Sequence, residues 1–167
     1  MGDFSKKGNV FKYKIVYLII LFLSFIWCFL FISVPFLAEG NFFCRKLAGF
    51  IFLFFSPICH QNPDRSFHLM GHPLAVCSRC SGIYIGFLLG VIIYPFFKGF
   101  NRKFLAPRWV LVAGMLPTIF EFVLSRSRII GSGLFFRSIT GLILGSVTAF
   151  YVIPAIFQVV DFHRKKL

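Results

Sequence analysis

Acidic side chains are scarce in this sequence. The 167 residues include five Asp and Glu against 18 Lys and Arg, for a formal net charge of +13. Charged residues of both signs make up only 14% of the chain, whereas a soluble domain typically has about 25%. Hydrophobic residues reach 58%, and 26 of them are Phe. A soluble fold of this length has too little interior for so much apolar surface, so the composition indicates a membrane protein.

Sequence signatures of common catalytic sites are also missing. The chain has no G-x-S-x-G nucleophile elbow, no G-K-[ST] phosphate loop and no G-x-G-x-x-G dinucleotide fingerprint. Its basic residues lie between apolar runs and at both ends, a distribution that suits membrane lipid headgroups and argues against a nucleic-acid partner. The sequence therefore leaves open whether the protein is an enzyme, and its activity is unassigned.

Long apolar runs predict an all-α, polytopic membrane bundle of about four spans. A helix needs about 20 apolar residues to cross the hydrocarbon core. We expect one integral membrane domain over residues 1–167, with spans at about 15–37, 81–97, 109–124 and 134–160. The first run follows a basic start, but it is longer than a signal-peptide core of about 7–15 residues and no A-x-A-like site follows it. An uncleaved helix is therefore expected there.

A shorter apolar stretch, residues 47–58, precedes the Cys- and His-rich segment 59–80. A helix rises about 1.5 Å per residue, so this stretch is too short to span and is expected to be interfacial or re-entrant. An even number of spans puts both termini on one side of the cell (inner or cytoplasmic) membrane. That side carries the larger share of Lys and Arg, so the termini are predicted to be cytoplasmic and segment 59–80 extracytoplasmic.

Small residues recur at four-residue spacing in two of the predicted spans. One set is Gly82, Gly86 and Gly90, and the other is Gly141, Gly145 and Ala149. Such small-xxx-small faces let another helix approach closely. They predict close helix packing, and they also offer surfaces for a homo-oligomer or a membrane protein partner.

Cysteine and histidine spacing in segment 59–80 predicts a metal site. Cys77 and Cys80 form a C-x-x-C pair directly before a predicted helix, and Cys59-His60 lies upstream. Zinc and similar transition metals favour four thiolate and imidazole ligands. Cys59, Cys77 and Cys80 supply three, and either His60 or His72 supplies the fourth.

Three alternatives to a metal site remain open. A C-x-x-C pair at a helix N-terminus is also typical of thiol–disulfide oxidoreductases, because the helix end and Arg79 between the cysteines stabilise a thiolate. The same cysteines can form a structural disulfide on an oxidising side of the membrane. The third alternative is a small transporter or assembly factor whose path is lined by intramembrane charges.

Two of those charges, Glu121 and Arg137, are expected about one turn inside the outer ends of their spans. Charges inside a bilayer are costly and mark functional sites by default. The structural interpretation is a Glu121–Arg137 ion pair that fixes helix packing. The functional interpretation is a polar pocket for a substrate or anion beneath the cysteines, lined by Arg65, Arg79, Tyr84, Glu121 and Arg137.

Two strings of this sequence carry a family resemblance. Residues 59–67 read Cys-His-Gln-x-Pro-x-Arg-Ser-Phe, and residues 76–84 read Val-Cys-x-Arg-Cys-x-Gly-x-Tyr. They resemble an uncharacterised family of small prokaryotic membrane proteins, a domain of unknown function. Pro117-x-x-x-Glu121 and Arg137-x-x-Thr140-Gly141 resemble the later spans of that family. The resemblance implies a membrane protein with a Cys/His motif, and it favours His60 over His72 as a ligand.

Overall fold

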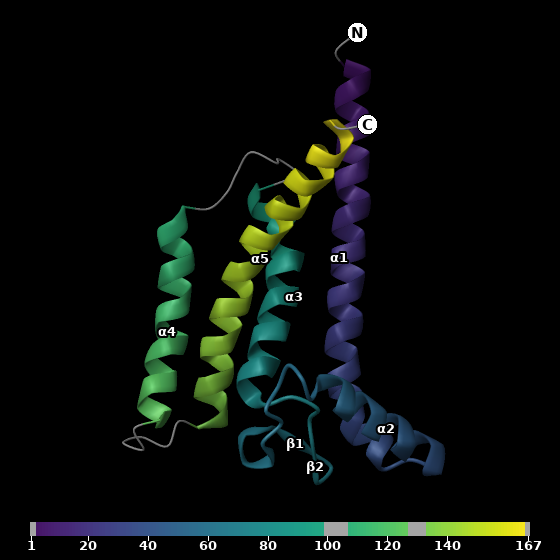
Figure 1. Cartoon of the computed structure of the whole chain (residues 1–167), viewed down its shortest axis with the longest axis vertical. Coiled ribbons are helices and arrows are strands. Elements are labelled where there is room, and N and C mark those ends of the chain that lie inside the picture. Colours follow the sequence, from purple (N-terminus) through teal and green to yellow (C-terminus); the bar gives the residue numbers. More distant parts are fainter. Residues whose placement is uncertain (1–2, 99–106, 127–132, 166–167) are drawn as a thin grey trace.

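The chain forms a bundle of four long helices with a small cap at one end, as the computed structural model shows (Figure 1). The structure describes residues 3–98, 107–126 and 133–165. The long helices are α1 (Asp3–Ala38), α3 (Ser78–Lys98), α4 (Arg108–Arg126) and α5 (Leu134–Lys165). The cap consists of α2 (Phe42–Phe55), the short 3-10 helix η1 (Pro63–Arg65) and the strands β1 (His68–Leu69) and β2 (His72–Pro73).

All four long helices are long and apolar enough to cross a membrane. Their outward faces carry many exposed large hydrophobic side chains, including Phe22, Phe29 and Phe120, as expected for surfaces that contact lipid. The prediction of an all-α, four-span membrane protein is therefore confirmed. α1 begins and α5 ends at one end of the bundle, and segment 59–80 lies at the other (Figure 1).

Helices α3 and α5 make the most extensive contact in the bundle. A Cβ atom added at Gly82 would lie 2.1 Å from the Ser138 carbonyl oxygen, and one at Gly145 would lie 2.0 Å from that of Ile83. Only glycine permits the two backbones to approach this closely. The two small-residue faces thus pack against each other within one chain, so a partner chain would have to use a different surface.

Helix α2 begins and ends earlier than the apolar stretch 47–58 suggests. Its 14 residues cover about 21 Å, and it runs at an angle to α1 (Figure 1). One side buries Ala48, Ile51 and Phe55, while Phe42 and Phe43 are largely exposed. The exposed side is largely apolar as well, so it is expected to contact lipid.

The β1–β2 hairpin was not expected from the sequence, where its residues read as an irregular polar stretch. Its turn residues Met70 and Gly71 have φ angles of 53° and 78°. Positive φ at both central positions is what a two-residue hairpin turn of the favoured type requires. The hairpin turns the chain back so that Leu74, Ala75 and Val76 enter the core beside Phe31 and Phe55.

The close α3–α5 contact predicts a strong effect of a single methyl group. Gly145→Ala should destabilise the protein by about 1–3 kcal/mol, because the added Cβ has no space against the backbone of α3. Gly49→Ala is the matched control, since a Cβ there would meet nothing within 4 Å. Thermal denaturation of both variants in detergent tests this, and equal melting temperatures would contradict it.

Candidate metal centre and its arginine-lined cavity

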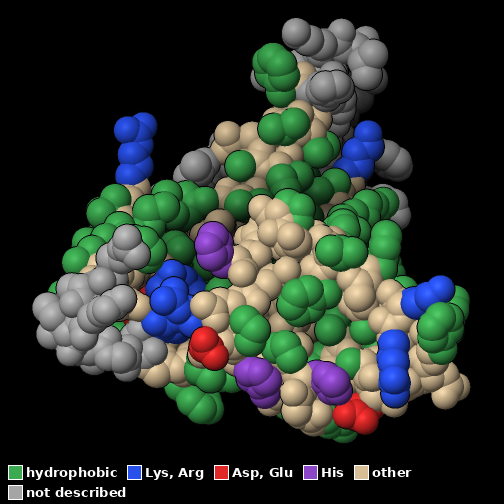
Figure 2. All heavy atoms as spheres, turned by 60° about the horizontal axis from the view of Figure 1, so that its bottom comes forward, with side chains coloured by type: hydrophobic (Ala, Val, Ile, Leu, Met, Phe, Trp, Pro, Cys, Tyr) green, Lys and Arg blue, Asp and Glu red, His purple; other side chains and the backbone are tan. Residues whose placement is uncertain are grey.

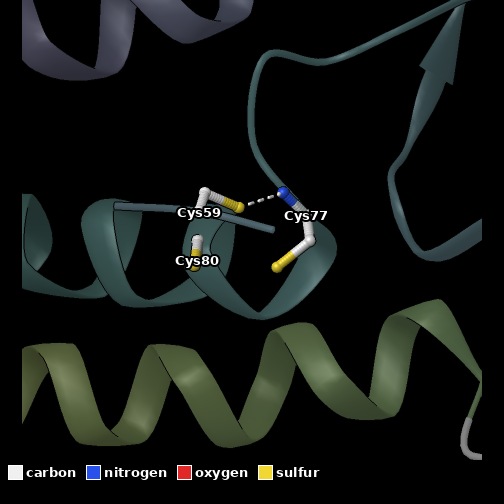
Figure 3. A group of neighbouring side chains, drawn as sticks. All are labelled: Cys59, Cys77 and Cys80. Atoms are coloured by element: carbon white, nitrogen blue, oxygen red, sulfur yellow. Dashed lines mark hydrogen bonds between the residues drawn. The ribbon is translucent and has the colours of Figure 1, made fainter. Parts of the chain in front are cut away.

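Three cysteines meet where the cap joins the bundle. Cys59 follows α2, Cys77 immediately precedes α3, and Cys80 lies in the first turn of α3 (Figure 3). Their sulfur atoms all lie within 4.8 Å of one another. The edges of a tetrahedral zinc–thiolate site are about 3.8 Å long, given Zn–S bonds of about 2.3 Å. The cluster is therefore close to the spacing that a shared metal ion requires.

Cys77 acts as the cap of α3, which begins three residues earlier than the predicted span. Its carbonyl oxygen accepts from the Ser81 backbone N–H at 2.9 Å, and its own N–H donates to the Cys59 sulfur at 3.1 Å (Figure 3). Hydrogen bonds with the thiols of Cys59 and then Cys80 lower the pKa of Cys77. These hydrogen bonds thus favour the thiolate at Cys77, which is the form of cysteine that binds metals.

Gln61 holds the two cysteine-bearing segments together. Its side-chain amide donates to the carbonyl oxygens of Phe52 at 2.6 Å and Ala75 at 2.8 Å, so it connects α2 to the segment between β2 and α3 that leads into Cys77. Its backbone adopts a positive φ of 46°, which places the side chain under the loop at a cost in backbone strain. Sequence reasoning did not find this role, although Gln61 stands in the motif that carries the family resemblance.

The next residues of the loop are fixed by local hydrogen bonds. The Asn62 side chain accepts from the Asp64 backbone N–H at 3.0 Å, and the Ser66 hydroxyl donates to the Asn62 carbonyl at 2.9 Å. These contacts form the turn η1 and point the chain toward the hairpin. Arg65 is thereby held near the cysteines.

Glu121 of α4 is fully buried and contacts two arginines. Its Oε2 accepts from both Nε and Nη2 of Arg79, with the Nε contact at 3.0 Å. Its Oε1 lies 3.4 Å from Arg137 Nε. Arg137 also donates to the Ser125 hydroxyl at 2.5 Å. The expected Glu121–Arg137 pair is present, but Arg79 joins it, so one carboxylate connects α3, α4 and α5.

A cavity of about 360 Å³ opens beside the cysteine cluster. Its polar lining includes all three cysteines and three arginines from separate elements: Arg65 of η1, Arg79 of α3 and Arg137 of α5. The full lining comprises Ile58, Cys59, His60, Asn62, Arg65, Cys77, Ser78, Arg79, Cys80, Phe122 and Arg137. Basic side chains gather on this end of the molecule (Figure 2).

The predicted site residues fall into different places. His60 lines the cavity and is exposed, but it is not part of the sulfur cluster. Tyr84 does not line the cavity and instead packs against the rings of Trp27, Phe31 and Phe55. His72, the other histidine considered as a ligand, lies 3.2 Å from Glu39. The structure thus brings together the cysteines and arginines, with His60 at their edge.

This fold and this site define a small multi-pass membrane protein whose polar and thiol groups gather at one end of the bundle. The chain belongs to the family described as "Predicted membrane protein (DUF2085)", which matches residues 59–151. The resemblance to an uncharacterised membrane protein family is thereby confirmed. The matched region begins at Cys59 and includes every residue that lines the cavity except Ile58.

Two archaeal proteins are similar to the chain. An uncharacterised protein of Methanocaldococcus jannaschii is 35% identical over 152 residues, which cover 89% of this chain and 96% of that protein. An uncharacterised protein of Methanothermobacter thermautotrophicus is 56% identical over 32 residues, which cover 19% of this chain and 29% of that protein. No solved structure matches the chain.

The three-residue charge cluster predicts unequal effects of its members. Glu121→Gln should cost about 3–5 kcal/mol, because it removes a buried carboxylate and leaves two partly buried arginines close together without it. Arg137→Gln should cost less, since Glu121 keeps Arg79. Exposed Arg108 provides the control variant, Arg108→Gln. Denaturation in detergent measures all three, and a larger loss for Arg137→Gln than for Glu121→Gln would refute the ranking.

The role of Gln61 predicts a change in cysteine accessibility. Gln61→Glu keeps the shape of the side chain but replaces the donor that both carbonyl groups accept from. The loop should open, and alkylation of Cys59 and Cys77 should become faster than in the unaltered protein. Mass spectrometry of the alkylated peptides reads each cysteine separately, and Cys44 in α2 serves as internal control. Unchanged rates at Cys59 and Cys77 would show that Gln61 does not hold the cluster.

Proposed function

We propose that the protein binds a transition metal, zinc or a similar ion, through Cys59, Cys77 and Cys80. The observation that carries this proposal is the meeting of three thiols from two chain segments within 4.8 Å. Soft thiolate ligands select zinc and copper(I) over hard cations such as magnesium. Hydrogen bonds from the Gln61 side chain and from the Cys77 backbone N–H hold the cysteine-bearing segments together.

The surroundings of the cluster support a metal–thiolate centre. Three arginines line the same cavity, and nearby positive charge stabilises thiolates. Three cysteines fill three positions of a tetrahedron, and structural zinc sites have four protein ligands. His60 lines the cavity and is the candidate for the fourth. Its exposed ring would have to turn toward the sulfurs, and a ligand in the cavity is the other source of a fourth donor.

The location of the site supports a function at the extracytoplasmic membrane surface. The cysteines lie at the opposite end of the bundle from the start of α1 and the end of α5 (Figure 1). The distribution of Lys and Arg favours a cytoplasmic position for those two ends. A metal centre here would sit at the depth of the lipid headgroups, where both membrane lipids and soluble ligands reach it.

A second candidate function is that of a thiol–disulfide oxidoreductase that passes electrons from its cysteines to a membrane quinone. Its supporting observation is a second cavity of about 380 Å³ between α1, α3 and α5, lined by Trp27, Tyr84, Phe87 and other residues. Tyr84 lies one helical turn from Cys80, so this largely apolar groove runs toward the cysteine cluster. In the reaction the Cys77 and Cys80 thiols would form a disulfide, and their two electrons and two protons would reduce quinone to quinol.

Metal content separates the two candidates. We expect about one zinc or similar ion per purified chain, and a loss of that ion together with thermal stability in Cys77→Ser. Cys44→Ser is the matched control, because Cys44 lies in α2 outside the cluster. Elemental analysis and thiol counting on the same samples give the answer. Equal metal content in Cys77→Ser and in the unaltered protein would contradict the metal site, and a reducible Cys77–Cys80 disulfide without metal would favour the oxidoreductase.

A further inference from the structure

We propose that the cavity beside the cysteine cluster binds a phosphoryl anion, held mainly by Arg65 and by the basic groups around it. The inference builds on the proposed function, because it names the class of ligand that would lie next to the metal. The same chemistry is offered by the headgroup of a phospholipid and by a free phosphate compound. The arginines and Ser78 would bind the anion whether or not the metal is present.

The positive charge of the arginines that line the cavity exceeds the negative charge that acidic side chains place beside them. Three arginines line the cavity, and the acid that contacts two of them is Glu121. The chain has only four other acids. Glu39 pairs with His72, Asp64 does not line the cavity, and Asp3 and Asp161 belong to the opposite end of the bundle. Residues 1–2, 99–106, 127–132 and 166–167 contain no Asp or Glu, so the sequence offers no further acidic side chain to balance the arginines.

A second observation concerns the contacts of the Arg65 side chain. Within residues 3–98, 107–126 and 133–165, its guanidinium makes no hydrogen bond or ion pair, although its side chain lines the cavity. Arg79, in contrast, directs Nε and Nη2 to Glu121. Glu121 thus holds Arg79 and Arg137 in place, and Arg65, which is exposed and lines the cavity, is the arginine that an incoming anion can engage.

A third observation concerns the buried hydroxyl of Ser78, which has no hydrogen-bond partner among the described residues. Ser78 is fully buried, lines the cavity and is the first residue of α3. Its Oγ makes no hydrogen bond among the described residues, and a buried polar group left unpaired costs about 1–3 kcal/mol. The N-terminus of a long helix also favours an anion, because its first N–H groups have no acceptor within the helix. Ser78 and the helix end face the same cavity as the arginines.

The geometry favours a phosphoryl group over a carboxylate. The cationic groups come from three separate elements, η1, α3 and α5, and the hydroxyl from the start of α3. Donors that surround a ligand from several directions suit the three oxygens of a phosphoryl group better than the two in-plane oxygens of a carboxylate. The cavity, at about 360 Å³, is within the size range of small-ligand sites.

Binding should be tested by measuring how much each probe stabilises the full chain. The first probe is inorganic phosphate, added to the protein in a detergent with an uncharged headgroup and compared with chloride at constant ionic strength. The second probe is phosphatidic acid in nanodiscs, compared with nanodiscs of phosphatidylcholine alone. Arg65→Gln should weaken binding about tenfold or more, as expected for loss of a charge-assisted hydrogen bond. Arg65→Lys should fall between, because it keeps the charge but not the planar fork. Arg108→Gln, at an exposed arginine outside the cavity, is the control.

Phosphate-dependent stabilisation that Arg65→Gln loses and Arg108→Gln keeps would support the inference and identify a free phosphate compound. The same pattern with phosphatidic acid alone would support it and identify a lipid headgroup. No stabilisation by either probe, or equal stabilisation of the unaltered protein and Arg65→Gln, would overturn it. Metal content, measured on the same samples, distinguishes this proposal from the metal site. Cys77→Ser should lose the metal, but it keeps the arginines and should still be stabilised by phosphate.

Discussion

One buried carboxylate, that of Glu121, connects three of the four long helices. It takes Arg79 from α3 and Arg137 from α5 while it is itself part of α4. Charged groups in the hydrocarbon region are tolerated where they pair with one another or face a polar cavity, and both conditions hold here. α4 packs mainly against α5, for example through the Thr118 hydroxyl, which donates to the Thr140 carbonyl oxygen, and the ion cluster connects α4 to α3 as well.

The same cluster explains why a basic cavity can exist at this depth. α3 and α5 pack backbone to backbone through their glycines, which brings Arg79 and Arg137 close to each other. Glu121 offsets part of their mutual repulsion and holds them in position. Cys77 immediately precedes α3 and Cys80 lies in its first turn, so both thiols line the same cavity as the arginines. The start of α3 thus supplies Cys77, Cys80 and Arg79, and other elements bring Cys59, Arg65 and Arg137 to the same cavity.

The sequence predicted much of this arrangement because the relevant signals are local or compositional. Long apolar runs located the four spans, and the C-x-x-C spacing located the thiols of Cys77 and Cys80. The pairing of Arg79 with Glu121 was missed because the two residues are 42 positions apart in the sequence. They meet only through the way α3 and α4 are placed in the fold, which no local sequence pattern encodes. The β1–β2 hairpin was missed because its strands are two residues long and Met70 is an unusual residue for a turn with positive φ.

Three other differences have equally simple causes. The small-residue faces were recognised, but a small-xxx-small pattern does not say whether its partner helix belongs to the same chain. Tyr84 shares a helix with Cys80, yet its ring joins the aromatic group of Trp27, Phe31 and Phe55 instead of the cavity. Gln61 had no chemical signal of its own, and its role became visible only with the two carbonyl groups that it bridges.

If the three thiols share one metal ion, X-ray absorption spectroscopy at the edge of the bound metal should detect them directly. We expect about three sulfur neighbours at about 2.3 Å and one lighter neighbour in the purified protein. A metal surrounded only by nitrogen and oxygen would place the ion elsewhere on the protein. That result would contradict the assignment of Cys59, Cys77 and Cys80 as its ligands.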